Sequence, residues 1–139
     1  MAFKFLPHTA DVKIQAEGKS LEDAFRQSAL ALKEVMSDKT KIKAKIKREF
    51  SLVSENKESL LYDFLEQFLY LFDAENFMLA GINEMKITKT KKGLKLNARV
   101  AGDNSSDYKF TNEVKAITYN EMKIQEEKDK VTITFVLDV

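Results

Sequence analysis

The chain has 139 residues, of which 44% are hydrophobic and 32% are charged, and its 23 Lys and Arg nearly balance its 22 Asp and Glu. This composition is typical of a soluble globular protein, and it excludes a disordered chain or a strongly basic nucleic-acid binder as a class. Cysteine is absent, which excludes disulfides, thiolate metal sites and catalysis by a cysteine nucleophile.

Nothing in the sequence predicts export or membrane insertion. The N-terminus lacks a basic segment followed by a long apolar run, so we expect no secretory signal. The longest mostly apolar stretch, residues 60–72, is interrupted by Asp63, Glu66 and Gln67 and is too short to cross a bilayer. We therefore expect a cytoplasmic protein with no membrane partner. One proline and four glycines leave no flexible linker, which predicts a single domain over residues 1–139.

The first part of the chain predicts a strand followed by a helix. After Asp11, apolar and polar residues alternate over residues 12–17, which is the pattern of a half-buried strand ended by Gly18. Ser20, with Asp23 three residues later, is a helix-capping pattern. Apolar residues at helical spacing then predict a helix that ends near residue 38.

A basic strand and a second helix are predicted next. Lysines alternate with apolar residues over residues 39–47, and the same parity continues to Leu52, which predicts a strand with one basic, solvent-facing side. Residues 58–74 predict a helix that is apolar nearly all round, and we expect it to be the central element of the core.

The remaining residues read as strands. The predicted segments are a short strand at 77–79, a hairpin over 84–102 turning at Lys92–Gly93, a loop at 103–107, and a second hairpin over 114–139 turning near Lys128–Asp129. Two helices and about seven strands, with the helices set apart from the hairpins, predict an α+β fold of two layers in which mostly antiparallel sheets pack against two helices.

Two aspartates at opposite ends of the chain share a strand parity. Asp11 precedes one strand on its polar parity, and Asp138 ends the last strand on the parity opposite to its core residues. If these strands pair antiparallel, both carboxylates and the terminal carboxylate of Val139 meet. Three carboxylates repel one another unless a proton or cation neutralises them, and oxygen ligands suit Ca²⁺ or Mg²⁺. The pattern alone favours the plainer interpretation, a turn residue and a solvated penultimate residue.

Other chemistry-bearing residues give weaker signals. His8 is the sole histidine, which excludes a histidine-pair metal site; a turn hydrogen bond is its plainer role, and a role beside Asp11 is the alternative. Lys115 reads as an exposed lysine beside a strand. The lysines of residues 39–47 fit either RNA phosphates or protection of an exposed strand edge, and we favour edge protection. The chain has no phosphate loop, nucleophile elbow or dinucleotide fingerprint, so nothing supports a self-sufficient enzyme.

Four segments of the chain carry a family resemblance. They are HTADVKIQAEGKSLEDAF (8–25), LLYDFLEQFLYLFDAE (60–75), VKAITYNEMKI (114–124) and the ending FVLDV (135–139). Together these segments resemble the archease family. The resemblance covers nearly the whole chain in the same order. The HTAD start combined with an aspartate before one last apolar residue is its most specific feature.

The resemblance implies a function that the patterns do not. Archeases are accessory proteins of the tRNA-splicing RNA ligase that joins 3′-phosphate and 5′-hydroxyl ends with GTP. They promote guanylylation of the ligase and its multiple turnover, and they are not ligases themselves. The family fold is α+β with strand–helix–strand units and an acidic metal site, whose ligands match Asp11, Asp138 and Val139. Ca²⁺ is the first candidate ion, with Mg²⁺ and Mn²⁺ as alternatives, and His8 and Lys115 would be supporting neighbours.

One departure and two alternatives complete the prediction. The family often has histidine where this chain has Asn120, so we expect no histidine-dependent role at that position. A general chaperone or adaptor for an RNA-modifying enzyme, such as a tRNA methyltransferase, is the alternative function, and it would need no metal. Direct RNA binding is the least favoured, because the net charge is near zero, and contact with RNA is expected only indirectly through the ligase.

Overall fold

The computed structural model describes residues 2–7, 11–110 and 113–139. The elements are β1 (Ala2–Leu6), β2 (Val12–Gly18), α1 (Leu21–Ser37), β3 (Ile46–Ser54), α2 (Lys57–Glu75), β4 (Phe77–Thr90), β5 (Gly93–Asn104), a 3₁₀ turn (Ser105–Asp107), β6 (Ala116–Ile117), β7 (Lys123–Glu127) and β8 (Lys130–Asp138). Two helices and two antiparallel sheets confirm the predicted α+β class.

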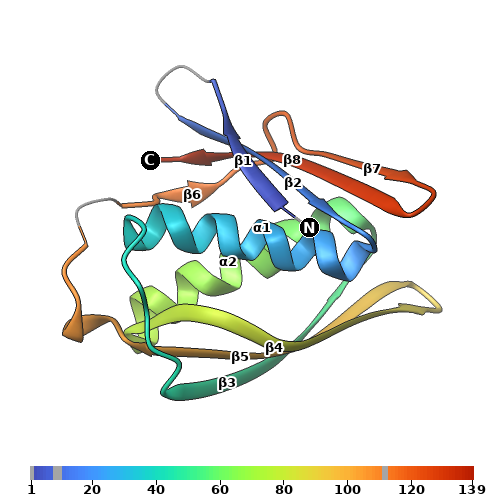
Figure 1. Cartoon of the computed structure of the whole chain (residues 1–139). Coiled ribbons are helices and arrows are strands. Elements are labelled where there is room, and N and C mark those ends of the chain that lie inside the picture. The colour runs from blue at the N-terminus through green and yellow to red at the C-terminus, as the bar shows by residue number, and fades with distance from the viewer. Residues whose placement is uncertain (1, 8–10, 111–112) are drawn as a thin grey trace.

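The helices lie between the two sheets (Figure 1). One sheet has the order β1-β2-β8-β6, with β7 also paired to β8, and the other has the order β3-β5-β4. The sequence predicted two layers, whereas the helix layer is covered on both sides. The reason is that α2 is apolar on most of its circumference and has to be buried from more than one direction.

Both helices begin and end with local capping contacts. The Ser20 side chain accepts a hydrogen bond from the Asp23 N–H at 3.1 Å, as the sequence predicted, and Asn56 does the same for Ser59 at 2.8 Å in α2. Each helix ends at a residue in the left-handed conformation, Asp38 in α1 and Asn76 in α2. No helix in the described part of the chain is long and apolar enough to span a membrane.

The helices meet in one aromatic core. Phe25 of α1 and Phe64 of α2 are fully buried, with ring centroids 5.6 Å apart. Phe68 of α2 packs edge-on against Phe64 at 5.1 Å and against Phe50 of β3 at 5.9 Å. Of the polar residues that interrupt the apolar run of α2, Asp63 and Glu66 are exposed and Gln67 is half-buried. The buried leucines and phenylalanines of α2 confirm its role as the central core element.

The predicted basic strand over residues 39–47 is wrong for most of its length. β3 begins at Ile46, and residues 39–45 form a crossing segment that runs from the end of α1 to the three-stranded sheet (Figure 1). Asp38 and Lys39 have φ of 50° and 61°, which turns the chain away from a strand direction. The crossing segment is held by single hydrogen bonds, from Lys45 N–H to the Gly102 carbonyl at 2.8 Å and from Lys43 N–H to the Tyr108 hydroxyl at 3.0 Å.

A buried aspartate attaches the loop after β5 to the crossing segment. Asp103 is 4% exposed and accepts hydrogen bonds from the Tyr108 hydroxyl at 2.7 Å and from the Asn104 N–H at 2.9 Å. The Tyr108 hydroxyl in turn accepts from Lys43. The hydrogen bond from Tyr108 and then that from Asn104 lower the pKa of Asp103, against an opposing effect of burial, with a smaller contribution from the charges of Lys45 and Lys43.

This lowered pKa predicts an acid-dependent loss of stability. A carboxyl whose folded pKa is depressed stabilises the fold above its unfolded pKa, about 3.9, and the contribution is lost as pH falls through the folded value. We therefore expect Asp103→Asn to be less stable than the native chain at pH 7, and the difference to shrink below about pH 4. Urea unfolding at pH 7 and at pH 3 measures this, and an equal difference at both pH values would contradict it.

Candidate functional site

The two strands that flank the predicted metal site are hydrogen-bonded neighbours. β2 and β8 pair antiparallel from Val12 opposite Leu137 to Gly18 opposite Val131. The next pair in this register is Asp11 and Asp138, since β2 begins directly after Asp11 and β8 ends at Asp138. The strand pairing on which the predicted site depended is therefore confirmed.

The register also defines the face that these residues share. Ile14 and Phe135 are opposite each other, fully buried on the side of the helices. The alternate pairs, such as Gln15 with Thr134, lie on the outer face, and the same alternation assigns Asp11 and Asp138 to that face. Asp138 is exposed and Asp11 is half-buried.

Strand β6 holds the C-terminal end in place. Ala116 pairs with Asp138, and the Lys115 N–H donates to the Asp138 carbonyl at 2.7 Å. The Thr118 hydroxyl donates to the Val136 carbonyl at 3.0 Å. Lys115 is therefore a neighbour of Asp138 through its backbone, and its side chain is exposed. Val139, the last residue, is 37% exposed. The predicted neighbour His8 lies outside the described residues.

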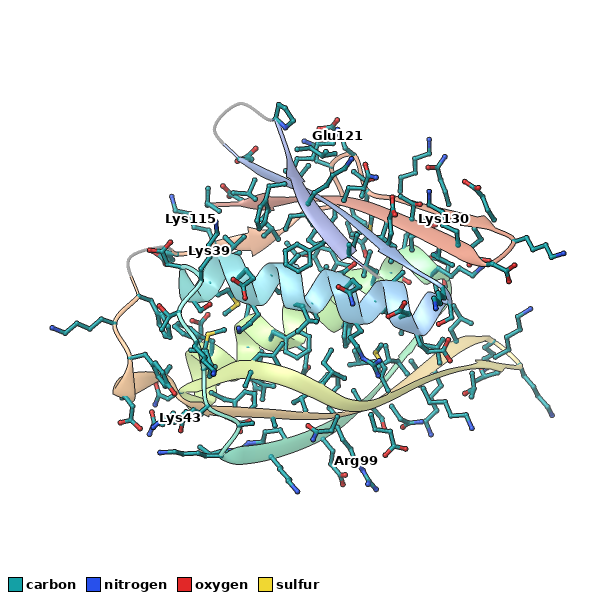
Figure 2. All side chains as sticks on the ribbon, viewed as in Figure 1. Lys39, Lys43, Arg99, Lys115, Glu121 and Lys130 are labelled. Atoms are coloured by element: carbon teal, nitrogen blue, oxygen red, sulfur yellow. The ribbon has the colours of Figure 1, made fainter. Side chains whose placement is uncertain are left out.

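An ion pair that the sequence did not indicate lies on the same face. Lys13 Nζ and Glu121 Oε1 are 3.0 Å apart and join β2 to the turn between β6 and β7. Figure 2 shows Glu121 beyond the five-stranded sheet, on the side away from the helices. Lys13 is two residues from Asp11, so it brings a positive charge to the region of the two aspartates. Asn120, the departure from the family pattern, is exposed in the same turn.

A stacked tyrosine pair lies on the other side of this turn. Tyr119 is 54% exposed, and its ring stacks on Tyr62 of α2 with centroids 4.4 Å apart and planes 7° from parallel. Burial and then the neighbouring Glu66 carboxylate raise the pKa of Tyr62, and burial, with Asp63 and Glu66, raises that of Tyr119. The sequence prediction missed this acidic and aromatic surface, because the two tyrosines are 57 residues apart and only the fold joins them.

The residues at the strand end suit a hard cation in their chemistry. Two aspartates and a terminal carboxylate offer oxygen atoms alone, the ligands that Ca²⁺, Mg²⁺ and Mn²⁺ prefer. Over residues 2–7, 11–110 and 113–139, no three His, Cys, Asp or Glu side chains gather as a metal site. The predicted set differs from such a cluster, because it has two side-chain ligands and its third ligand is the main-chain carboxylate of Val139. The metal assignment stays a prediction.

Comparison with known proteins gives one consistent result. Residues 3–139 match the model of the Archease protein family. A protein archease of Pyrococcus abyssi is 44% identical over 124 residues, covering 88% of this chain and 87% of the relative. One of Methanothermobacter thermautotrophicus is 35% identical over 138 residues, covering 99% and 98%.

Two solved structures share the fold. The solution structure of Methanobacterium thermoautotrophicum protein 1598 has a TM-score of 0.82 at 32% identity and covers 99% of this chain and 98% of its own. The crystal structure of an archease from Thermotoga maritima, described as a possible chaperone, has a TM-score of 0.62 at 21% identity and covers 98% and 96%. The second likeness concerns the fold alone.

Proposed function

This chain belongs to the archease protein family, and we propose that it is a non-catalytic accessory protein that activates the GTP-dependent tRNA-splicing RNA ligase. The ligase joins 3′-phosphate and 5′-hydroxyl RNA ends, and the accessory protein promotes its guanylylation and multiple turnover. The observation that supports the proposal is the register of β2 and β8, whose last pair is Val12 opposite Leu137, so that Asp11 and Asp138 are the next residues at this strand end.

The proposed working site is the outer strand end formed by Asp11, Asp138 and the terminal carboxylate of Val139. These carboxylates would hold a divalent cation, because a cation relieves the repulsion between like charges gathered at one strand end. When bound, the cation supplies positive charge that stabilises phosphate oxygens during nucleotidyl transfer to the ligase. Asp138 is exposed at the end of its strand, so a protein partner can reach it without unfolding the sheet.

The surface beside this strand end suits a protein partner. Tyr119 follows β6, whose Ala116 pairs with Asp138, and it presents a half-exposed aromatic ring backed by Tyr62. Exposed tyrosines are enriched at protein interfaces, because their rings contribute large contact areas at a low entropic cost. We infer that the ligase contacts this tyrosine pair while the acidic strand end reaches its nucleotide site.

A guanylylation assay tests the proposed function. The ligase is incubated with labelled GTP and Mn²⁺, with and without this protein at one tenth of the ligase concentration. We expect a faster approach to the guanylylated ligase and several turnovers of RNA joining per ligase, because the accessory protein acts repeatedly. Unchanged rates of guanylylation and joining at equimolar protein would overturn the proposal.

The alternative is a chaperone or adaptor for an RNA-modifying enzyme such as a tRNA methyltransferase. It rests on the family, one of whose structures, that from Thermotoga maritima, is described as a possible chaperone. A chaperone would reduce heat-induced aggregation of its client, measured by light scattering, equally well before and after removal of metal with a chelator. It would leave the guanylylation rate of an already folded ligase unchanged, so the two functions give opposite results in the two assays.

A further inference from the structure

The near-zero net charge of the chain hides an uneven distribution in space. Residues 39–54 and 77–104, which form the crossing segment and the three-stranded sheet, contain 12 Lys and Arg but only three Asp and Glu. The rest of the chain contains 11 basic and 19 acidic residues. These two ranges therefore carry a formal charge of +9, and the remainder of the chain carries −8.

The positive charges on this side are mostly uncompensated. Ten of the twelve basic residues are exposed lysines: Lys39, Lys41, Lys43, Lys45, Lys47, Lys86, Lys89, Lys91, Lys92 and Lys95. Within the described residues none of the ten forms an ion pair, and only the two arginines do: Arg48 with Glu75 at 3.0 Å, and Arg99 with Glu49 and Glu84 at 3.4 and 3.5 Å. Edge protection needs only a few charges on an edge strand, so it does not account for ten lysines of which four lie on the three strands, four on the crossing segment and two in the β4–β5 turn.

The lysines follow the whole length of the sheet. The crossing segment lies at the end where Ile46 pairs with Gly102, and the β4–β5 turn, with Lys91 and Lys92, lies at the other end. Between them, Lys47 and Lys95 lie on the outer face. Figure 2 shows Lys43 and Arg99 on this side of the molecule, opposite Glu121. Because the 12 residues of β5 rise about 3.3 Å each, the positive stripe is about 40 Å long.

The composition of this face distinguishes between anionic partners. A protein interface has an apolar, lysine-poor core, whereas Val53 is the large hydrophobic residue that this sheet exposes. A single small anion would need a few convergent groups, not a stripe about 40 Å long. Lysines with interspersed polar side chains, such as Ser51 and Asn97, are the groups that contact the nucleic-acid backbone.

We propose that a set of cations on the outer side of the three-stranded sheet, its turn and the crossing segment, which we call the basic face, binds the phosphate backbone of nucleic acid without reading its sequence. The set comprises Lys41, Lys43, Lys45, Lys47, Lys86, Lys91, Lys92, Lys95 and Arg99. The phosphate contact stands on the charge distribution alone, and its assignment to RNA rests on the proposed function. The basic face lies on the sheet opposite to the one that carries Asp138 (Figure 1), so one molecule can contact RNA and the ligase at separate surfaces.

Fluorescence anisotropy with a labelled 20-nucleotide single-stranded RNA tests this without the ligase. We compare the native chain with Lys47→Gln/Lys86→Gln/Lys95→Gln and with the control Lys4→Gln/Lys123→Gln/Lys128→Gln. The control lysines are exposed on or beside the five-stranded sheet, so both triple variants have the same net charge. At 50 mM KCl we expect about tenfold weaker binding for the basic-face variant and less than a twofold change for the control.

The salt dependence gives a second measure. Each lost contact with a single strand removes about 0.7 from the slope of log K against log salt, so the basic-face variant is expected to lose about 2. Equal losses in both variants, or no binding by the native chain at 50 mM KCl, would overturn the proposal. Binding of the native chain to vesicles of anionic phospholipid, without binding to RNA, would also overturn the proposal. A single-stranded DNA of the same sequence tests the RNA assignment alone, and equal affinity would remove that assignment.

Discussion

Replacement of Asp11 or Asp138 by asparagine is expected to reduce the stimulation of ligase guanylylation at least tenfold, and at most to the basal rate of the ligase alone. Each substitution removes one of the two side-chain carboxylates that the β2–β8 register assigns to the same strand end. Loss of a charged oxygen ligand weakens a hard-cation site, and even changes around such ligands cost about 10–100-fold in metal affinity. The measurement is the initial rate of labelled GMP transfer to the ligase at a limiting divalent-ion concentration.

A matched control separates this effect from a general loss of charge. Asp129 lies in the turn before β8, at the opposite end of the same strand, and has a φ of 63°. Asparagine adopts this left-handed conformation readily, so Asp129→Asn should fold normally and retain full stimulation.

Direct metal binding provides a readout that does not depend on the ligase. Calorimetric titration of the accessory protein alone with Ca²⁺ or Mn²⁺ should show weakened binding for Asp11→Asn and Asp138→Asn and unchanged binding for Asp129→Asn. Full stimulation by both strand-end variants would show that the acidic strand end is not the working site. If the strand-end variants lose metal binding but still stimulate guanylylation normally, activation of the ligase does not depend on the metal.

Periodicity predicted the elements whose contacts are local. The Ser20 cap, the extent of α2 to within a residue or two at either end, and the turn before Gly93 depend on residues close in sequence. The strand parity of β2 and β8 was readable for the same reason, because one side of each strand is buried against the helices. This parity was enough to indicate that Asp11 and Asp138 share a face.

Elements that depend on distant partners were not predicted. β1 has only five residues, too few for a period to stand out, and it forms by pairing with β2 in the register of Phe3 opposite Ala16. The short strand predicted at 77–79 is the start of the 14-residue β4, whose irregular pairing at Leu79 and Ile82 hides its continuity in the sequence. The crossing segment has a strand-like alternation, but its N–H groups bond to Gly102 and to a tyrosine side chain.

The residues around the candidate site could not be predicted from the sequence for a similar reason. Lys13 and Glu121 are 108 residues apart and become an ion pair only when the β6–β7 turn folds back over β2. Likewise, the alternating lysines of residues 39–47 were visible in the sequence, but their continuity with Lys86 and Lys95 arises from strand pairing. Net charge is a property of the whole chain, and it cannot report that residues 39–54 and 77–104 carry a surplus of positive charge.

Gly102→Ala is expected to destabilise the fold by about 3 kcal/mol, because a side chain there meets backbone that cannot move away. A Cβ at Gly102 would overlap the Met78 carbonyl oxygen of β4 and would lie 2.7 Å from the Phe77 ring. Gly102 also pairs with Ile46 and accepts the hydrogen bond from Lys45, so any shift of its backbone would loosen both the sheet and the crossing segment.

A second glycine at the same irregularity is the matched control. At Gly81, where β4 shifts register against β5, an added Cβ has no neighbour within 4 Å. Gly81→Ala should therefore change the free energy of unfolding by less than about 1 kcal/mol. Thermal unfolding measures both, and a fall of about 10 °C in Tm is expected for Gly102→Ala. Equal Tm values for the two variants would mean that the backbone of β4 can move away at Met78. Close packing at Gly102 would then not contribute to the stability of the three-stranded sheet.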